Sequence, residues 1–146
     1  MSNAERSSSL WRVVLDTNIL VSAFLFGGVP GAILQAAEAE RFTPLVSAPL
    51  KNELEEVLAE KFSFPEEMIE AACGRLWQIC EWIDPKIHLD ICIDEDDNRV
   101  LECAMEGHAE CIVSGDRDLL RLPPIPALSI LPPRAFLDRL QTAGKT

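Results

Sequence analysis

Short apolar runs that alternate with amphipathic segments predict an α/β sandwich with a mostly parallel sheet. Residues 12–15 and 111–114 are brief, largely apolar runs, and each is followed within two residues by an aspartate. Such runs are typical of buried parallel strands. The segments between the runs carry apolar residues at helical spacing. Because strands that alternate with helices form a sheet covered by those helices, we expect one α/β domain.

The expected elements follow the chain in that alternating order. The expected strands are residues 12–15, 44–47, 86–89, 111–114 and 128–131. The expected helices are residues 18–26, 32–40, 49–62, 66–82, a helix whose first turn is the acidic stretch near residue 97, a short turn at 119–120, and 134–140. Glycine and proline punctuate the connections, notably at residues 27–31 and 123–126.

The length of 146 residues fits a single domain, which we assign to residues 10–142, preceded by a flexible N-terminus at residues 1–9. No basic region leads into an apolar stretch at the N-terminus, and no apolar run reaches the length of a membrane span, so we expect no membrane partner. The five cysteines form no C-x-x-C pair. Reduced thiols and a cytoplasmic location are therefore expected.

The chain is acidic, with a formal net charge of −11. A surface of that charge repels polyanions at long range, so a polyanion would bind through a metal ion or a local basic patch. The same charge favours a basic partner. With only His88 and His108 in the chain, a Cys/His zinc site is not expected.

Acidic residues stand at the points where the predicted elements meet. Asp16 and Asp116 follow buried strands, and in open α/β sheets the carboxyl ends of the strands are where sites form. Asp97 lies in the first turn of an amphipathic helix, where an aspartate can also serve simply as an N-cap. Glu53 lies at the border of the apolar stripe of its helix, although a solvated helix acid is the more common case.

If the strands are adjacent, these carboxylates converge on one site. An all-oxygen cluster suits hard cations, so Mg²⁺ or Mn²⁺ is the expected cofactor. Asp118 and Asn18 are close enough in sequence to act as further ligands or to position water. Ser114 can hydrogen-bond a carboxylate or a phosphate. A bound ion would activate water and stabilise the charge of a phosphodiester transition state.

Four segments together resemble the PIN domain family, in that family's order and spacing. They are residues 15–18 (Leu-Asp-Thr-Asn), Glu53-Leu54 in its helix, Asp97-x-x-Val100-Leu101-x-x-Ala104, and residues 113–120. The likeness runs from about residue 13 to residue 136 and is closest to prokaryotic toxin components of toxin–antitoxin pairs. Asp94 and Asp96 also precede the third motif, but the apolar spacing favours Asp97 as the family residue.

The resemblance implies a three-layer α/β/α sandwich with a central, mostly parallel five-stranded sheet in the order 3-2-1-4-5. It also implies a Mg²⁺- or Mn²⁺-dependent endoribonuclease that hydrolyses single-stranded RNA, is often a homodimer, and can pair with a basic antitoxin. The positions that match the four catalytic and metal-binding acids are Asp16, Glu53, Asp97 and Asp116, with Asp118 as a further metal ligand and Asn18 and Ser114 as auxiliary groups. The expected phosphate contacts are the basic residues beside these motifs, Arg99, Arg117 and Arg121.

Two other functions remain open on the sequence. An acidic α/β module could dock a basic partner protein without nuclease activity, as the net charge suggests. A phosphohydrolase that works through an aspartyl-phosphate would also place an aspartate after a strand. That chemistry needs a second aspartate two residues on, and residue 18 is asparagine.

Overall fold

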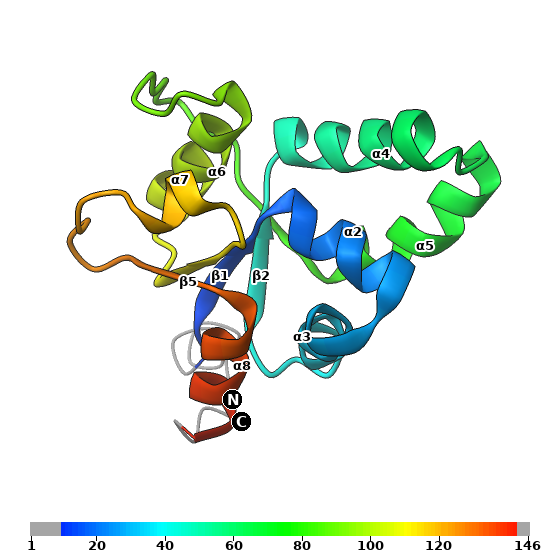
Figure 1. Ribbon diagram of the computed structural model, residues 1–146, viewed down its shortest axis with the longest axis horizontal. Helices are drawn as coiled ribbons and strands as arrows, with labels where there is room; N and C mark the ends of the chain where they lie inside the picture. The colour runs from blue at the N-terminus through cyan, green and yellow to red at the C-terminus, as the bar shows by residue number, and fades with distance from the viewer. Residues whose placement is uncertain (1–9, 143–146) are drawn as a thin grey trace.

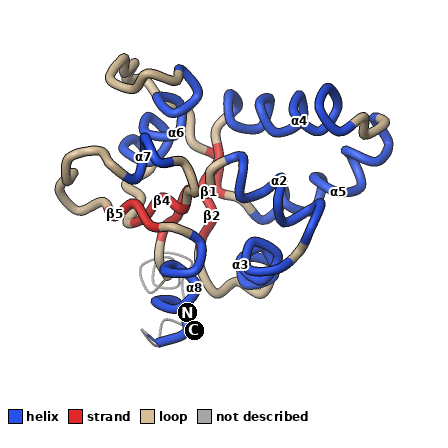
Figure 2. The backbone as a smooth tube through the Cα atoms, in the orientation of Figure 1, coloured by secondary structure: helices blue, strands red, loops and turns tan. Residues whose placement is uncertain are grey.

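The computed structural model describes residues 10–142 and shows an α/β fold. The predicted flexible N-terminus, residues 1–9, lies outside the described residues. Five strands form one sheet in the order β3-β2-β1-β4-β5, and every neighbouring pair is parallel. Figure 2 shows the strands in red at the centre of the molecule. The strands are β1 (Arg12–Leu15), β2 (Thr43–Val46), β3 (Glu81–Trp82), β4 (Cys111–Val113) and β5 (Ser129–Leu131). The sheet order predicted from the family resemblance is therefore confirmed.

Helices cover both faces of this sheet (Figure 1). They are α2 (Thr17–Phe26), α3 (Gly28–Glu38), α4 (Ala48–Phe62), α5 (Glu66–Ile79), α6 (Glu95–Glu106), α7 (Arg117–Leu120) and α8 (Pro133–Thr142). In residues 10–142 no single helix is long and apolar enough to span a membrane, and α2 with α3 passes the length and composition test only as a pair bent by 103°.

Two apolar cores account for the three layers. Side chains of successive strand residues point to opposite faces, so Val13 and Leu15 pack in one core while Val14 packs in the other. The first core contains side chains of α2, α3, α4, α5 and α8, and the second contains side chains of α6 and α7 together with Leu50 of α4. Val13 and Val14 are fully buried, and burial of each such side chain contributes about 1.5–3 kcal/mol.

The third strand was predicted in the wrong place. It is formed by Glu81 and Trp82, which pair with Leu45 and Val46 of β2, and not by residues 86–89. Helix α5 accordingly ends at Ile79, three residues before the predicted end, because Cys80 adopts an extended conformation. Several backbone N–H groups of residues 86–92 instead donate to side chains of α6, so this segment crosses the helix rather than extending the sheet.

The sheet order reverses direction between β1 and β4, which lie side by side with Leu15 opposite Val113. Parallel strands leave their carboxyl ends at the same edge, and a crevice forms where the order reverses. The residues that follow these two strands, Asp16 and Ser114, therefore emerge next to each other. Helices α2, α4 and α6 begin at this same edge.

Candidate metal centre

A short chain of hydrogen bonds joins the ends of β1 and β4. The Ser114 hydroxyl donates to Oδ2 of Asp16 at 2.7 Å and accepts the backbone N–H of Asp116 at 2.9 Å. Asp16 is 5% exposed and Ser114 is fully buried. Ser114 thus fixes the Asp16 carboxylate relative to the backbone that carries Asp116, two positions that are 100 residues apart in the sequence.

The N-terminus of α6 adds two more carboxylates to this edge. Asp94 is the N-cap of the helix, and its Oδ1 accepts the Asp96 N–H at 2.9 Å. Asp97 lies in the first turn and is 4% exposed. One carboxylate oxygen from each of Asp94, Asp97 and Asp116 can be chosen so that all three lie within 4.8 Å of one another. The cap role that the sequence allowed for Asp97 therefore belongs to Asp94.

The charge of this cluster is poorly compensated by the described residues. Oδ2 of Asp97 is buried and has no hydrogen-bond partner, although buried carboxylates normally have one. Burial, followed by the charges of Asp116 and Asp16, raises the pKa of Asp97 to about 7. Burial also raises the pKa of Asp16, against the opposing effect of the Ser114 hydrogen bond. A positive charge at this point would relieve both carboxylates.

Glu53 approaches the same edge from α4 and is half-buried, as its position on the helix predicted. Its Oε1 accepts the Thr17 hydroxyl at 2.5 Å. Burial raises the pKa of Glu53 to about 7, and the neighbouring carboxylates of Asp96 and Asp16 add to the rise. Glu53 therefore stands beside the cluster as a third carboxylate with a raised pKa, next to Asp96.

The auxiliary residues occupy different positions around the cluster. The Asp118 N–H donates to Oδ1 of Asp116 at 2.8 Å, while the Asp118 side chain and Arg117 are exposed. Asn18 is exposed in the first turn of α2. Arg99 is held by other partners: it donates to the carboxylates of Glu95 at 3.3 Å and Glu102 at 2.9 Å. The structure thus brings the four predicted acids and Ser114 to one edge of the sheet. Arg99, an expected phosphate contact, forms ion pairs with Glu95 and Glu102.

Asp94 is the member of the cluster that the sequence prediction did not select. The apolar spacing of the helix favoured Asp97, and that choice agrees with the burial of Asp97. The signal for Asp94 was its place immediately before the first helical turn, where a side chain can cap the helix. One of its carboxylate oxygens lies within 4.8 Å of oxygens of Asp97 and Asp116.

A cleft of about 580 Å³ opens beside the cluster, between α2, α4 and the start of α6. Its polar lining is strongly acidic, with Lys61 as the basic residue, and its apolar floor includes Val21 and Val57. The acidic lining residues are Glu53, Glu56, Glu60, Asp94 and Asp96. A ligand that enters from this cleft reaches Asp94 and Glu53 directly.

The donor set fits a hard divalent cation. Every candidate ligand is a carboxylate oxygen, which suits Mg²⁺ and Mn²⁺. Asp94, Asp97 and Asp116 would hold the ion, because their oxygens lie closest together and one of them lacks a partner. Asp16 stands behind them on Ser114, close enough for the charges of Asp116 and Asp94 to act on it.

The sequence carries a known family signature over the same residues. Residues 12–118 match the family model of the PIN domain. The chain belongs to the PIN domain family. PIN domains are generally nucleases, and the matched region contains all four predicted acids of this PIN domain.

This PIN domain is also similar to one further protein in sequence and to two solved structures in fold. An uncharacterized protein of Methanocaldococcus jannaschii is 30% identical over 116 residues, which cover 76% of this chain and 74% of that protein. A chain of the VapBC2 complex from Rickettsia felis, solved bound to a DNA fragment from its promoter, superposes with a TM-score of 0.59 at 20% identity, covering 82% of this chain and 96% of the other. The PIN domain of RRP44 from T. brucei gives 0.50 at 19% identity, covering 94% and 87%. The two solved structures show a shared fold.

Proposed function

We propose that this PIN domain is a Mg²⁺- or Mn²⁺-dependent endoribonuclease that hydrolyses phosphodiester bonds of single-stranded RNA. The observation that carries the proposal is the buried, unpartnered Oδ2 of Asp97, which lies in a cluster with Asp94 and Asp116. A buried carboxylate oxygen without a hydrogen-bond partner lowers the stability of the fold, whereas a metal ligand has to remain free until the ion binds. An ion held there would supply the positive charge that activates water and stabilises a phosphodiester transition state.

The chain's own residues have separate tasks in this proposal. Asp94, Asp97 and Asp116 hold the cation, and Ser114 keeps Asp16 aligned behind them. Glu53, with its pKa of about 7, is suited to accept a proton from water near neutral pH. The exposed Arg117 and Asn18 stand where an RNA phosphate could be contacted, while Asp118 supports Asp116 through its backbone N–H.

The direct test is cleavage of a labelled single-stranded RNA with Mg²⁺ or Mn²⁺ and with EDTA. We expect metal-dependent cleavage that either Asp16→Asn or Asp116→Asn abolishes. Asp138→Asn is the matched control, since it makes the same change at an exposed carboxylate on α8, a helix that lies apart from α6 and α7 (Figure 1). Cleavage that survives both site changes, or that persists in EDTA, would refute the proposal.

We further propose that the enzyme is the toxin of a toxin–antitoxin pair whose partner is basic. The VapBC2 complex is a fold relative, and the acidic cleft beside the catalytic edge offers five carboxylates against one lysine. Co-expression with the product of the adjacent reading frame tests this part. We expect a complex that silences cleavage and that weakens when Glu56 and Glu60 are changed to glutamine.

The same cleft supports a second candidate function, an acidic module that docks a basic partner without nuclease activity. In that case the complex would form as above, yet no divalent ion would support RNA cleavage by the free protein. The two functions are therefore separated by the activity of the free protein, not by the presence of a complex.

Location and assembly complete the proposal. The five cysteines are free thiols, as a reducing cytoplasm would keep them. A homodimer is favoured by large apolar side chains left exposed on the monomer, including Phe26 at 81% and Ile93 at 95%. Light scattering coupled to gel filtration measures the oligomeric state directly, and a monomer across a wide concentration range would remove this element of the proposal.

A further inference from the structure

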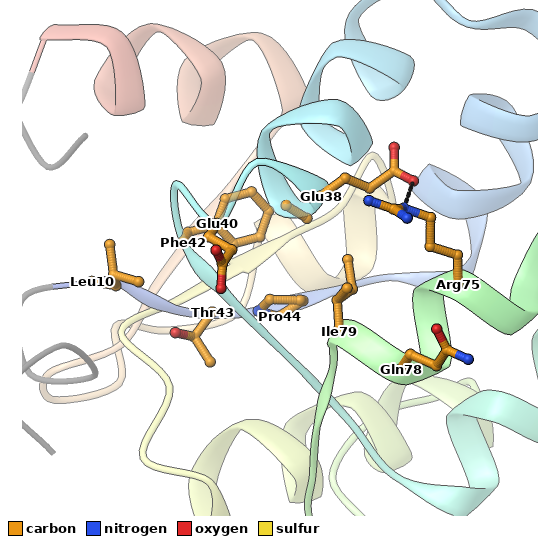
Figure 3. A pocket seen from close by; sticks show the side chains of 10 residues that line it. Leu10, Glu38, Glu40, Phe42, Thr43, Pro44, Arg75, Gln78 and Ile79 are labelled. Atoms are coloured by element: carbon orange, nitrogen blue, oxygen red, sulfur yellow. Dashed lines mark ion pairs between the residues drawn. The ribbon is translucent and has the colours of Figure 1, made fainter. Parts of the chain in front are cut away.

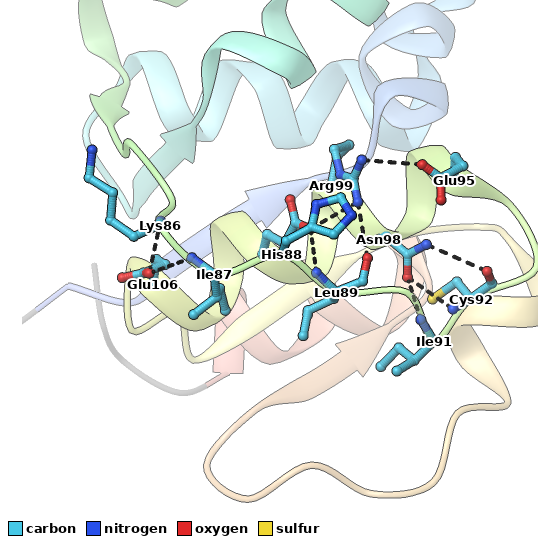
Figure 4. A network of polar contacts seen from close by, with 11 residues as sticks. Lys86, Ile87, His88, Leu89, Ile91, Cys92, Glu95, Asn98, Arg99 and Glu106 are labelled. Atoms are coloured by element: carbon cyan, nitrogen blue, oxygen red, sulfur yellow. Dashed lines mark hydrogen bonds and ion pairs between the residues drawn. The ribbon is translucent and has the colours of Figure 1, made fainter.

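Residues 86–92, which we term the strap, cross α6 and are fastened to it by side chains (Figure 4). Asn98, Glu102 and Glu106 are spaced four residues apart, so they lie on one face of the helix. Each accepts backbone N–H groups of the strap, which runs antiparallel to the helix. The bonds are Lys86 N and Ile87 N to Glu106 Oε1 at 3.0 and 3.1 Å, Leu89 N to Glu102 Oε2 at 2.7 Å, and Ile91 N and Cys92 N to Asn98 Oδ1 at 3.0 and 2.9 Å.

Arg99 completes the fastening at the middle of the strap. Its guanidinium donates to the Leu89 carbonyl at 3.1 Å and to the Glu102 carboxylate at 2.9 Å. Glu102 is 6% exposed, and a carboxylate that is this buried is held in place by such charge-assisted bonds. These hydrogen bonds between the strap and α6, which we term the ladder, take the place of the strand pairing that the sequence predicted for this segment.

The strap ends at the metal centre. Cys92, the last residue held by the ladder, is two residues before Asp94, and Asn98 directly follows Asp97. Asn98 is fully buried. One amide side chain thus ties the backbone that leads into Asp94 to the helical turn that carries Asp97. The relative position of these two carboxylates depends on that tie.

We propose that Asn98, Glu102 and Glu106 are positioning residues that set the spacing of Asp94 and Asp97 by clamping the strap to α6. The inference rests on the proposed function, since it concerns the same metal centre. Mutation of a residue that orients a metal ligand without binding the metal itself typically lowers metal affinity by roughly 10–100-fold. We expect loss of Asn98 to have the largest effect on metal binding, because Asn98 is nearest to the cluster. Loss of Glu106 should have the smallest effect, because Glu106 is two turns farther along the helix.

The test is Mn²⁺ binding to the full chain, measured by calorimetry and by the EPR signal of free Mn²⁺. Asn98→Leu removes the acceptor at nearly constant size, and we expect the Kd for Mn²⁺ to rise roughly tenfold or more. Glu102→Leu should have a smaller effect and Glu106→Leu the smallest. The matched controls are Glu102→Gln and Glu106→Gln, which keep a carbonyl acceptor for the strap and should bind Mn²⁺ with a Kd close to that of the wild type.

Amide hydrogen exchange of residues 86–92 provides a second readout that needs no metal. We expect each leucine variant to lose protection at its own strap amides and the glutamine variants to keep it. If Asn98→Leu does not fold, the Glu102 pair carries the same test at a site that does not adjoin a ligand.

The outcomes separate the two ideas. Exposed strap amides with an unchanged Mn²⁺ Kd would overturn the positioning role and leave the proposed function standing. A wild-type protein that binds no Mn²⁺ would overturn the proposed function and the clamp's purpose with it. Equal losses for the leucine and glutamine variants of Glu102 would show that its charge matters and not its hold on the strap, which also overturns the inference.

Discussion

At one end of the central sheet an acidic side chain is paired with a basic one, whereas at the other end acidic side chains lie beside one another. At the end where the strands begin, Arg12 donates to both carboxylate oxygens of Glu81, at 2.9 and 2.6 Å, and to the Gly107 carbonyl at 3.0 Å. That hydrogen bond lowers the pKa of Glu81 and raises the pKa of Arg12. At the end where the strands finish, carboxylates face one another, and the pKa of Asp97 rises to about 7.

A second ion pair reinforces the contrast. Arg75 and Glu38 meet at 3.0 Å on the rim of a cavity of about 490 Å³ at the starting end of the sheet (Figure 3). The charges of Arg75 and Glu38 are thus matched within the protein. At the finishing end the charges are left unmatched at some cost to stability, which is the pattern of a site kept ready for a cation.

Loss of a ligand from the unmatched end should have the largest effect. Asp116→Asn removes one carboxylate oxygen from the proposed cation site, so we expect RNA cleavage to fall by about a thousandfold or more, since loss of one group that stabilises transition-state charge already costs about a hundred- to a thousandfold. Single-turnover cleavage at saturating Mn²⁺ measures the effect. A loss below tenfold would mean that the cluster is not where the chemistry occurs.

A bound cation should also stabilise the fold. At pH 8, Mn²⁺ at 100 times its Kd for that pH should add about 2.7 kcal/mol to the free energy of unfolding, and the same concentration is used at pH 6. The gain should be greater at pH 8 than at pH 6, because at the lower pH the ion has to displace a proton from Asp97. Urea titrations with and without Mn²⁺ at both pH values would show it, and an equal gain at the two pH values would contradict the raised pKa.

Without metal, Asp97→Asn should make the protein more stable at pH 8, by on the order of 1–2 kcal/mol. The pKa of Asp97 rises from 3.8 to about 7 on folding, so its ionisation opposes folding. That penalty is absent at pH values below the unfolded pKa, grows between the two pKa values, and is complete above about 7. The advantage of the variant should therefore shrink as the pH falls towards 4. Urea titrations across this range in EDTA test the sign, and a variant that is less stable than the wild type at pH 8 would refute it.

At the matched end, Glu81→Gln should have the smallest effect. The pair with Arg12 is partly exposed, at 24% and 43% for the two side chains, so its loss should cost about 0.5–1 kcal/mol at pH 7. The pKa of Glu81 is lowered on folding, so this contribution fades as the pH falls through that pKa. The Mn²⁺ Kd should not change. A variant that alters metal binding would show that the two ends of the sheet are coupled.

Most of the fold could be predicted because its strands are short, apolar and bounded by turns. The four strands at residues 12–15, 43–46, 111–113 and 129–131 all lie within one residue of their predicted places. The third strand could not be found in this way. Glu81 and Trp82 are both exposed, and a two-residue strand at the sheet edge leaves no apolar pattern to read.

The centre was only partly visible in the sequence. Asp16 and Asp116 follow predicted strands, so their meeting at one edge follows from parallel pairing alone. Asp94 was weighed against Asp97 as an alternative, whereas the structure places both beside Asp116. The partners of Arg99 were equally hidden, because Glu102 and the Leu89 carbonyl reach it only through the strap.

The sequence by itself determined the alternation of strands and helices, the order of the acidic motifs and their family, because each depends on periodicity or spacing within a short window. Tertiary structure alone decided which edge strand pairs with β2, which carboxylates come within 4.8 Å of one another, and which acid remains unpartnered. Those outcomes depend on competition for hydrogen bonds between segments far apart in the chain. Local sequence patterns do not indicate which of these competing hydrogen bonds form.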